Sequence, residues 1–342
     1  MKLGLNISVV LASVLALLDS SAALAQGLQV QGPSIFYNGK PITLRGVGVG
    51  DVVSGRAKRP LSDYCTIAGD WNANVIRMGI HPGVWKHTDH KAVLLELKRN
   101  VDAALAEGMF VIIDWHVIGW PDGYSETPDE KWGSPADLYD SGFALAKDFW
   151  EQVSRSFGAD SRILFELWNE PVASEDDWKP SSEPKWLALK TYWKQLLAII
   201  RKTTSNVVIV AGNSWGYDLR GVRLAPLADV NVAYSWHVYA GKDRNKEEHW
   251  AAHLDELQKT RPVLVTEWGF DPSGEIADQD AQVNFGEKFV HDFLENQHLH
   301  SVAWCWHAKW SPAMLKPDWI TPTSFGLFVR NYLRTPFSGS KP

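Results

Sequence analysis

Short, almost continuous apolar runs recur along the chain, and each of them ends in polar residues. The run at 163–169 reads ILFELWN and is followed by Glu170 and Pro171. A strand that is apolar on both faces is typical of a parallel sheet covered by helices. Because proline has no N–H to donate, Pro171 predicts the end of this strand and places Asn169 and Glu170 where a loop begins.

Eight such runs predict eight strands. They lie at 42–49, 75–80, 110–116, 163–169, 207–213, 231–238, 262–269 and 301–308. Amphipathic segments with helical spacing separate most of them, such as 90–108 and 184–203. Strand and helix repeated eight times predict a single-domain α/β fold, the (β/α)8 TIM barrel, with a degenerate fifth unit at 214–229. A doubly wound open sheet is the alternative, and the count of eight disfavours it.

The start of the chain predicts an export signal. Lys2 supplies a positive charge, residues 7–18 are mostly apolar, and Ala23-Leu24-Ala25 has the small-x-small form of a cleavage site. At about a dozen residues the apolar run is too short for a membrane span. We expect a signal peptide over 1–25, one barrel domain over 26–342, and a secreted or periplasmic protein without a membrane anchor.

Charge and cysteine content exclude several function classes. The formal net charge is −6, and no Lys/Arg cluster is present, so we expect no nucleic-acid partner. Cys65 and Cys305 are the only cysteines, too few for a disulfide scaffold or a multi-cysteine zinc site. Whether these two pair with each other is left open by the sequence.

Polar and aromatic residues at the ends of the strands predict one pocket, because these ends share one rim of a barrel. They are Arg77, Asp114, His116, Asn169, Glu170, Asn213, His237, Tyr239, Glu267, Trp304 and Trp306. Glu170 ends strand four and Glu267 ends strand seven, which faces it across the barrel. Two carboxyl groups across a cavity suit glycoside hydrolysis. A structural ion pair is the alternative for either carboxylate alone.

Neighbouring rim residues predict support for these carboxylates. Arg77 is suited to holding one of them ionised. His237 and Tyr239 are two positions apart and share one face of their strand, as do Asp114 and His116. No second cluster completes a three-ligand set around Asp114 and His116, so we predict neither a metal nor another cofactor.

Tryptophan is abundant, with 18 residues, and its flat ring is suited to stacking on sugar rings. The candidates for sugar contact follow strand ends: Trp120, Trp132, Trp215, Trp268, Trp304 and Trp306, with Tyr124 in the long loop after strand three. That loop is rich in glycine, proline and aromatic residues, which is typical of a binding loop.

Two segments, FELWNEP at 165–171 and VTEWGF at 265–270, resemble the signatures of glycoside hydrolase family 5, the retaining enzymes of the cellulase type. The resemblance extends over nearly the whole chain after the signal. It implies that Glu170 is the acid/base and Glu267 the nucleophile. It also implies that Asn169 bonds the sugar 2-hydroxyl.

The same resemblance implies supporting roles for further residues. Arg77 and Tyr239 would contact the nucleophile, and His116 and His237 would line the same subsite. The segment WCWHAK resembles the family's strand-eight segment, which maps onto Trp304, as a sugar platform, and Lys309. The chain departs from the family after strand one, where a histidine is common and VGVGDVVSG stands at 47–55.

The function expected from the sequence is that of a secreted retaining endo-β-1,4-glucanase. We expect a monomer that binds a β-linked polysaccharide or oligosaccharide. A β-mannanase or a xyloglucanase is the alternative with the same catalytic pair. A non-catalytic carbohydrate-binding protein is the alternative from another class, and the presence of both carboxylates disfavours it. A metal-dependent hydrolase would need more His and Asp ligands at the strand ends.

Overall fold

The computed structural model describes residues 27–54, 59–128, 134–174, 183–240, 247–254, 256–271 and 282–336. The predicted signal peptide at 1–25 and the candidate Trp132 lie outside these residues. Within the described ranges, no helix has both the length and the apolar character that crossing a membrane requires.

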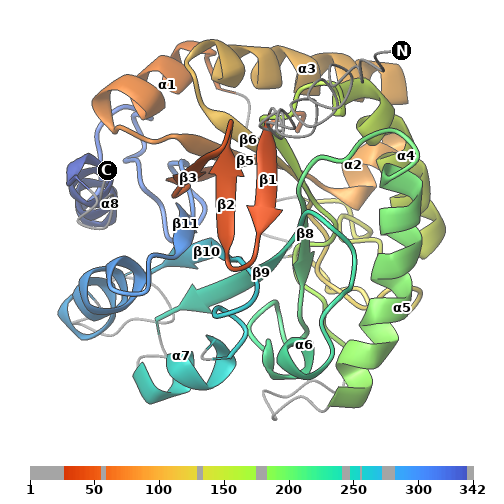
Figure 1. The fold of residues 1–342 in the computed structure, drawn as a ribbon. Coiled ribbons are helices and arrows are strands. Elements are labelled where there is room, and N and C mark those ends of the chain that lie inside the picture. Colours follow the sequence, from red (N-terminus) through yellow and green to blue (C-terminus); the bar gives the residue numbers. More distant parts are fainter. Residues whose placement is uncertain are drawn as a thin grey trace, which may run out of the picture.

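Eight parallel strands close into a barrel, as the apolar runs predict (Figure 1). They are β4 (Arg45–Asp51), β5 (Val75–Ile80), β6 (Phe110–Trp115), β7 (Ile163–Glu166), β8 (Val208–Ala211), β9 (Val232–Tyr239), β10 (Val263–Gly269) and β11 (His300–Ala303). The strands follow one another around the ring in chain order, and β11 pairs with β4. This closure confirms the barrel and excludes the doubly wound open sheet.

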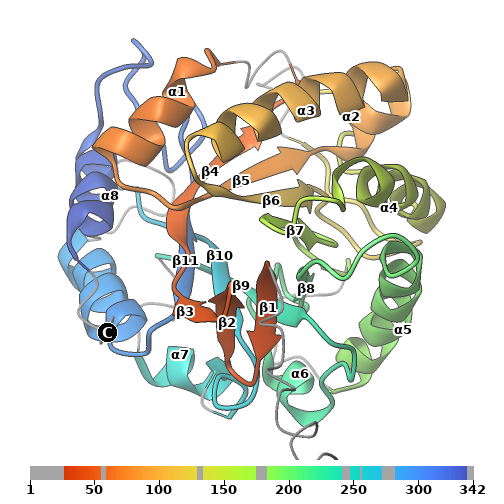
Figure 2. The same ribbon diagram turned by 45° about the horizontal axis from the view of Figure 1, so that its top comes forward.

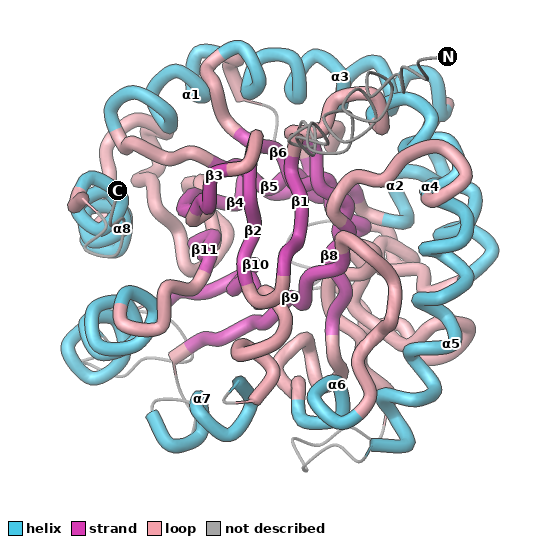
Figure 3. Tube along the Cα trace, in the orientation of Figure 1, coloured by secondary structure: helices cyan, strands magenta, loops and turns pink. Residues whose placement is uncertain are grey.

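Helices surround the strands, and α3, α4 and α5 can be followed along the outside of the barrel (Figures 2 and 3). The α-helices are α1 (Ser62–Cys65), α2 (Pro82–His87), α3 (His90–Ala106), α4 (Phe143–Phe157), α5 (Glu183–Ile200), α6 (Arg220–Leu224), α7 (Glu247–Leu254) and α8 (Ser324–Arg334). Two segments, Thr66–Asp70 and Gln282–Glu295, are wound as π-helices. The helices predicted at 90–108 and 184–203 correspond to α3 and α5, and the short α6 confirms the degenerate fifth unit.

The fourth strand is shorter than its apolar run. The run at 163–169 predicts a strand up to Asn169, whereas β7 ends at Glu166. Beyond it the chain leans toward the third unit, because the N–H groups of Asn169 and Glu170 donate to the carbonyl oxygens of Trp115 and Val117. Glu170 is therefore held by backbone hydrogen bonds just past the strand end.

A small antiparallel sheet precedes the barrel and was not predicted. It consists of β1 (Leu28–Gln31), β2 (Ser34–Tyr37) and β3 (Lys40–Ile42). Asn38 and Gly39, with φ of 49° and 77°, form the tight turn between β2 and β3. Leu28 and Ile35 from this sheet pack with residues at the starts of the barrel strands, among them Val75, Phe110, Leu164 and Val207. The sheet therefore covers the amino end of the barrel, opposite the predicted pocket.

The two cysteines do not form a disulfide. Cys65 is exposed at the end of α1, and Cys305 is buried after β11. Burial also raises the pKa of the Cys305 thiol well above its usual value. The question that the sequence left open is therefore settled in favour of two free thiols.

Ile35 tests the contribution of the small sheet to stability, because its side chain is completely buried. We expect Ile35→Ala to lower the free energy of unfolding by about 2–4 kcal/mol, since it removes buried methyl groups and leaves a cavity. Urea unfolding followed by tryptophan fluorescence measures this change. Ile320→Ala is the control, because Ile320 is 81% exposed. Equal effects of the two substitutions would contradict a stabilising role for the small sheet.

Candidate functional site

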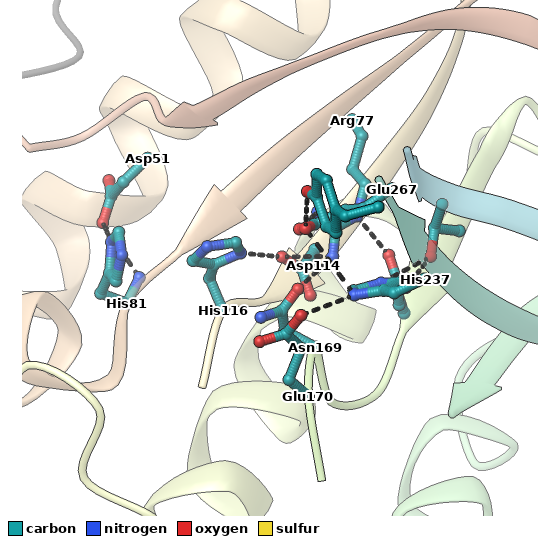
Figure 4. A network of polar contacts seen from close by, with 12 residues as sticks. Asp51, Arg77, His81, Asp114, His116, Asn169, Glu170, His237 and Glu267 are labelled. Atoms are coloured by element: carbon teal, nitrogen blue, oxygen red, sulfur yellow. Dashed lines mark hydrogen bonds and ion pairs between the residues drawn. The ribbon is translucent and has the colours of Figure 1, made fainter. Parts of the chain in front are cut away.

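Arg77 lies at the centre of the rim cluster and joins side chains from several strands (Figure 4). Its side chain is 1% exposed. Nε donates to Oε2 of Glu166 at 2.5 Å, Nη1 to Oε1 of Glu267 at 2.7 Å, and Nη2 to Oδ1 of Asn169 at 2.7 Å. Nη2 also lies 3.0 Å from Oδ2 of Asp114. One guanidinium thus fixes three carboxyl groups and one amide, which matches its fork of N–H donors.

Glu267 on β10 is held at both carboxylate oxygens. Oε1 accepts from Arg77, and Oε2 accepts from the hydroxyl of Tyr239 at 2.6 Å. Tyr239 reaches it because β9 and β10 are neighbours in register, with His237 beside Glu267. His237 and Tyr239 share one face of β9, as the sequence predicts.

Glu170 contacts His237 rather than Arg77. Oε1 of Glu170 lies 3.0 Å from Nδ1 of His237, and the Glu170 side chain is 13% exposed. The same Nδ1 lies 3.7 Å from Oε2 of Glu267. His237 therefore stands between the two carboxyl groups, which come within 4.8 Å of each other.

The surroundings of the two carboxyl groups separate their acidities. Burial raises the pKa of Glu170, and the negative charge of Glu267 adds to this effect while His237 opposes it. Burial also acts on Glu267, but the positive charges of His237 and Arg77 outweigh it and lower the pKa of this carboxyl. The site therefore favours a protonated Glu170 beside an ionised Glu267, one acid and one anion.

His116, Asp114 and Trp304 form another side of the cluster. Nδ1 of His116 lies 2.6 Å from Oδ2 of Asp114. The His116 ring stacks on Trp304 with centroids 5.2 Å apart and an interplanar angle of 11°. Burial lowers the pKa of His116 well below its usual value, so the ring is neutral. Trp304 is half-buried, which leaves part of its ring open to a ligand.

A histidine also lies beside the first strand, although none follows that strand in the sequence. Oδ2 of Asp51, at the end of β4, accepts from the backbone N–H of His81 and lies 2.8 Å from its Nδ1. The His81 ring lies edge-on to His116, with centroids 4.8 Å apart, and 5.6 Å from the Tyr139 ring. Figure 4 shows the Asp51–His81 pair next to His116. The chain lacks the family's histidine after the first strand, but His81, which follows the second strand, lies beside the end of the first.

A metal ion is disfavoured by the contacts in the site. Among the described residues, Glu170, His237 and Glu267 offer atoms close enough together to hold a cation. However, both oxygens of Glu267 are already bonded, one of them to the positive Arg77. A divalent cation there would compete with the guanidinium for the same carboxylate.

Two of the tryptophans predicted as candidates for sugar contact are buried in the core. Trp268 is completely buried among Phe289, Phe325 and Tyr332 on the helix side of β10. Side chains alternate along a strand, so Trp268 faces away from the pocket that Glu267 enters. Trp306 is also buried: it packs against Trp71, and its Nε1 donates to Asp63.

The other aromatic candidates lie nearer the surface. Trp120 and Trp215 are half-buried, and Nε1 of Trp215 donates to Glu126 at 3.1 Å. Tyr124 is 38% exposed in the loop after β6. Lys309 is exposed, and its backbone N–H donates to Nδ1 of His307. The structure thus joins the predicted residues Glu170, Glu267, Asn169, His237 and Tyr239, with His116 and Trp304 through Asp114, into one cluster around Arg77. Within the described part of the chain, the side chain of Lys309 makes no hydrogen bond or ion pair with this cluster.

Five residues of the site were not predicted: Glu166, Thr266, Asp51, His81 and Tyr139. Glu166 lies inside the apolar run, where it resembles a position in a buried strand rather than part of the pocket. Its position four residues before Glu170 did not indicate that it belongs to the site. Tyr139 lies in the long loop, and burial together with the charges of Glu170 and Glu267 raises its pKa.

The fold and the site together define a class of protein. A closed (β/α)8 barrel with two neighbouring carboxyl groups, one just past the fourth strand and one near the end of the seventh, is the arrangement of a barrel-type glycoside hydrolase. The chain belongs to glycosyl hydrolase family 5, the cellulase family, whose model matches residues 37–310.

Curated relatives of the chain are named as a cellulase and an endoglucanase. The chain is 25% identical over 279 residues to Cellulase CelDZ1 of Thermoanaerobacterium sp, a match that covers 78% of this chain and 66% of the relative. It is 26% identical over 278 residues to Endoglucanase A of Evansella cellulosilytica, covering 78% of this chain and 51% of that protein. The chain therefore spans only part of the length of these relatives.

Solved structures share the fold. The β-glucanase SdGluc5_26A of Saccharophagus degradans, in complex with cellotetraose, matches with a TM-score of 0.78 and 24% identity, covering 90% of this chain and 93% of that one. The catalytic domain of Thermobifida fusca endoglucanase Cel5A matches with a TM-score of 0.70 and 20% identity, covering 90% and 97%. At these identities the likeness establishes the fold.

The buried charges of the site predict how stability depends on pH. The carboxylates around His237 outweigh the effect of its burial and raise its pKa from 6.5 to about 10. The stabilisation from this group is complete below pH 6.5 and is lost as pH rises through about 10. We therefore expect the free energy of unfolding to fall between pH 7 and 10, and to fall less in His237→Asn.

Urea unfolding at several pH values measures this dependence. His87→Asn is the control, because the His87 side chain is 55% exposed and its contact with Asp137 is a surface ion pair. We expect the control to follow the wild type. An equally steep loss in His237→Asn and in the wild type would show that His237 is not charged in the folded protein.

Proposed function

We propose that the chain is a retaining endo-β-1,4-glucanase that cleaves β-1,4-glucan by double displacement. The observation that carries this proposal is the approach of Glu170 and Glu267 within 4.8 Å. Retaining glycosidases hold their carboxyl groups about 5–5.5 Å apart, and inverting ones hold them roughly 6.5–9.5 Å apart. The opposite shifts in the acidity of the two groups support the division into acid and nucleophile.

In the first step, an oxygen of Glu267 attacks the anomeric carbon while Glu170 protonates the departing glycosidic oxygen. The bond to the leaving sugar breaks, and a glycosyl ester forms on Glu267. In the second step, the Glu170 carboxylate takes a proton from water, and this water attacks the same carbon. The ester bond breaks, and both carboxyl groups return to their starting states.

The contacts of Glu267 support its role as the nucleophile. Arg77 and Tyr239 each hold one carboxylate oxygen, so the group stays ionised and oriented toward the pocket. The amide oxygen of Asn169 accepts from Arg77, so the amide N–H groups remain to bond a sugar hydroxyl. We propose the 2-hydroxyl as their partner, since it lies beside the anomeric carbon.

Glucan is the proposed polymer because the curated relatives are named cellulases and endoglucanases. A structural neighbour holds cellotetraose, a β-linked oligosaccharide. Mannan differs from glucan in the orientation of the 2-hydroxyl, which a fixed Asn169 amide would distinguish. A β-mannanase or xyloglucanase with the same catalytic pair is the alternative that the substrate test below distinguishes.

The first test is reducing-sugar release from carboxymethylcellulose, mixed-linkage β-glucan, xyloglucan and mannan. We expect release from the two glucans and a loss of roughly a hundredfold to ten-thousandfold in kcat for Glu170→Ala, and a larger loss for Glu267→Ala. Glu107→Ala, at the exposed end of α3, is the matched control. Release from mannan or xyloglucan alone would overturn the substrate, and full activity of either site variant would overturn the mechanism.

Azide separates the two roles within the same experiment. With an aryl β-cellobioside, azide enters the space left by a missing carboxylate. Glu267→Ala should yield the α-glycosyl azide, because azide attacks from the side of the lost nucleophile. Glu170→Ala should yield the β-glycosyl azide, because azide attacks the ester on Glu267. The reverse pairing of products would contradict the assignment of roles.

Trp304 is the proposed platform for a sugar ring beside the catalytic pair. We expect Trp304→Ala to raise KM for soluble glucan roughly fivefold, because stacking contributes about 1 kcal/mol beyond simple burial. Trp304→Phe retains an aromatic face and should recover part of the affinity. Initial-rate kinetics measure both variants, and thermal unfolding checks that each is folded. An unchanged KM in Trp304→Ala would remove the platform role.

A further inference from the structure

A chain of hydrogen bonds leads from Arg77 to Glu170 through residues that are almost completely buried. Arg77 holds Oε2 of Glu166, and Oε1 of Glu166 accepts from the hydroxyl of Thr266 at 2.7 Å. The Thr266 oxygen lies 3.0 Å from Nε2 of His237, and Nδ1 of His237 lies 3.0 Å from Glu170. Glu166 and Thr266 are completely buried, and His237 is 1% exposed.

The protons that these residues carry fix which group donates and which accepts in each hydrogen bond. Arg77 has only donors, so Glu166 must accept from it. Despite burial, Arg77 and His237 lower the pKa of Glu166 to about 2, so this group is a carboxylate with no proton to give. Thr266 has one hydroxyl proton, which goes to Glu166. Its oxygen is then left to accept from Nε2 of His237, so Nε2 carries a proton.

We infer that Thr266, oriented by Glu166, is a positioning residue that fixes a proton on Nε2 of His237 and leaves Nδ1 to exchange its proton with Glu170. The inference rests on the proposed role of Glu170 as the acid. The proton between Nδ1 and Glu170 can lie on either partner, and when it lies on Glu170, His237 is neutral and presents a lone pair to the protonated acid. With Nε2 bare and Nδ1 protonated, the ring would instead donate to Glu170 and stabilise its carboxylate.

In this proposal, the proton that is transferred in catalysis is the one on the Nδ1 side of the His237 ring. In the first step, the proton shared by Glu170 and Nδ1 moves to the glycosidic oxygen. In the second step, a proton from water returns to the same pair. The proton on Nε2 stays in place throughout, because Thr266 accepts it and Glu166 prevents the hydroxyl from turning round.

Other charged groups near His237 do not account for this asymmetry. Glu267 lies 3.7 Å from Nδ1, the same nitrogen that faces Glu170. Glu166 lies 3.9 Å from Nε2, beyond hydrogen-bond distance, so Thr266 makes the contact on that side. The two nitrogens thus have different partners: the hydroxyl on Nε2, and the carboxyl of the acid on Nδ1.

Glu166→Gln tests the proposal by reversing the direction of the hydrogen bonds that join residue 166, Thr266 and His237. The oxygen of the introduced amide must face Arg77, which only donates, so the amide N–H turns toward Thr266. The hydroxyl is then free to donate to Nε2, and neutral His237 should carry its proton on Nδ1. Nitrogen-15 NMR of labelled histidine, recorded at a pH above the pKa of His237, reads this tautomer without any substrate.

The double variant Glu166→Gln with Thr266→Val is the matched control, because it has the same charge but no hydroxyl. We expect the reversed tautomer in Glu166→Gln only. In that variant the alkaline limb of kcat/KM should move to lower pH, with a loss of roughly tenfold to a hundredfold above neutrality. A wild-type tautomer in Glu166→Gln would overturn the proposal.

Thr266 provides a second measurement that does not depend on the folding of Glu166→Gln. Thr266→Val removes the acceptor for Nε2–H, so the imidazolium should lose its proton at lower pH than in the wild type. Thr266→Ser keeps the hydroxyl and should restore the wild-type titration. Identical titrations of Thr266→Val and the wild type would overturn the proposal. Failure of the proposed function would instead show as a wild type that releases no sugar.

Discussion

The Arg77 guanidinium is the interaction on which the site depends. A charge with 1% exposure is stable only when its neighbours compensate it, and Arg77 has carboxyl groups from β6, β7 and β10 around it. These groups would repel one another in its absence. Because the same cation binds Glu166, Asn169 and Glu267, their positions are not independent, and substitutions among them will not have additive effects.

This shared cation also explains how two similar carboxyl groups acquire different chemistry. Glu267 is bonded to Arg77, whereas among the described residues Glu170 has His237 as its partner of opposite charge. His237 lowers the pKa of both groups, and Arg77 and the Tyr239 hydroxyl lower that of Glu267 further, so the difference in acidity comes from these partners. His237 stands between them and couples the protonation of one to the charge of the other.

The sequence predicted the barrel because buried parallel strands leave long apolar runs, and it predicted the rim residues because the topology brings strand ends together. The prediction of Trp268 as a candidate for sugar contact failed although the information was present: Glu267 faces the pocket, so the next side chain faces the helices. Glu166 contacts Arg77 from the end of β7 but was hidden in an apolar run. The small amino-terminal sheet was missed because strands of three or four residues leave little pattern, although Asn38-Gly39 is a hairpin signal. Side-chain distances such as those around His237 arise only from packing.

The two ends of the barrel should tolerate substitutions differently, because the small sheet covers the amino end and the site occupies the other. The buried charges of the site are concentrated at the opposite end, where function limits what can be stabilised. The cluster around Leu28 and Ile35 contains none of the site residues. Thermostability can therefore be engineered by substitutions in the core at this end of the molecule. The residues of the site, whose rigidity and activity are balanced against each other, are then left unchanged.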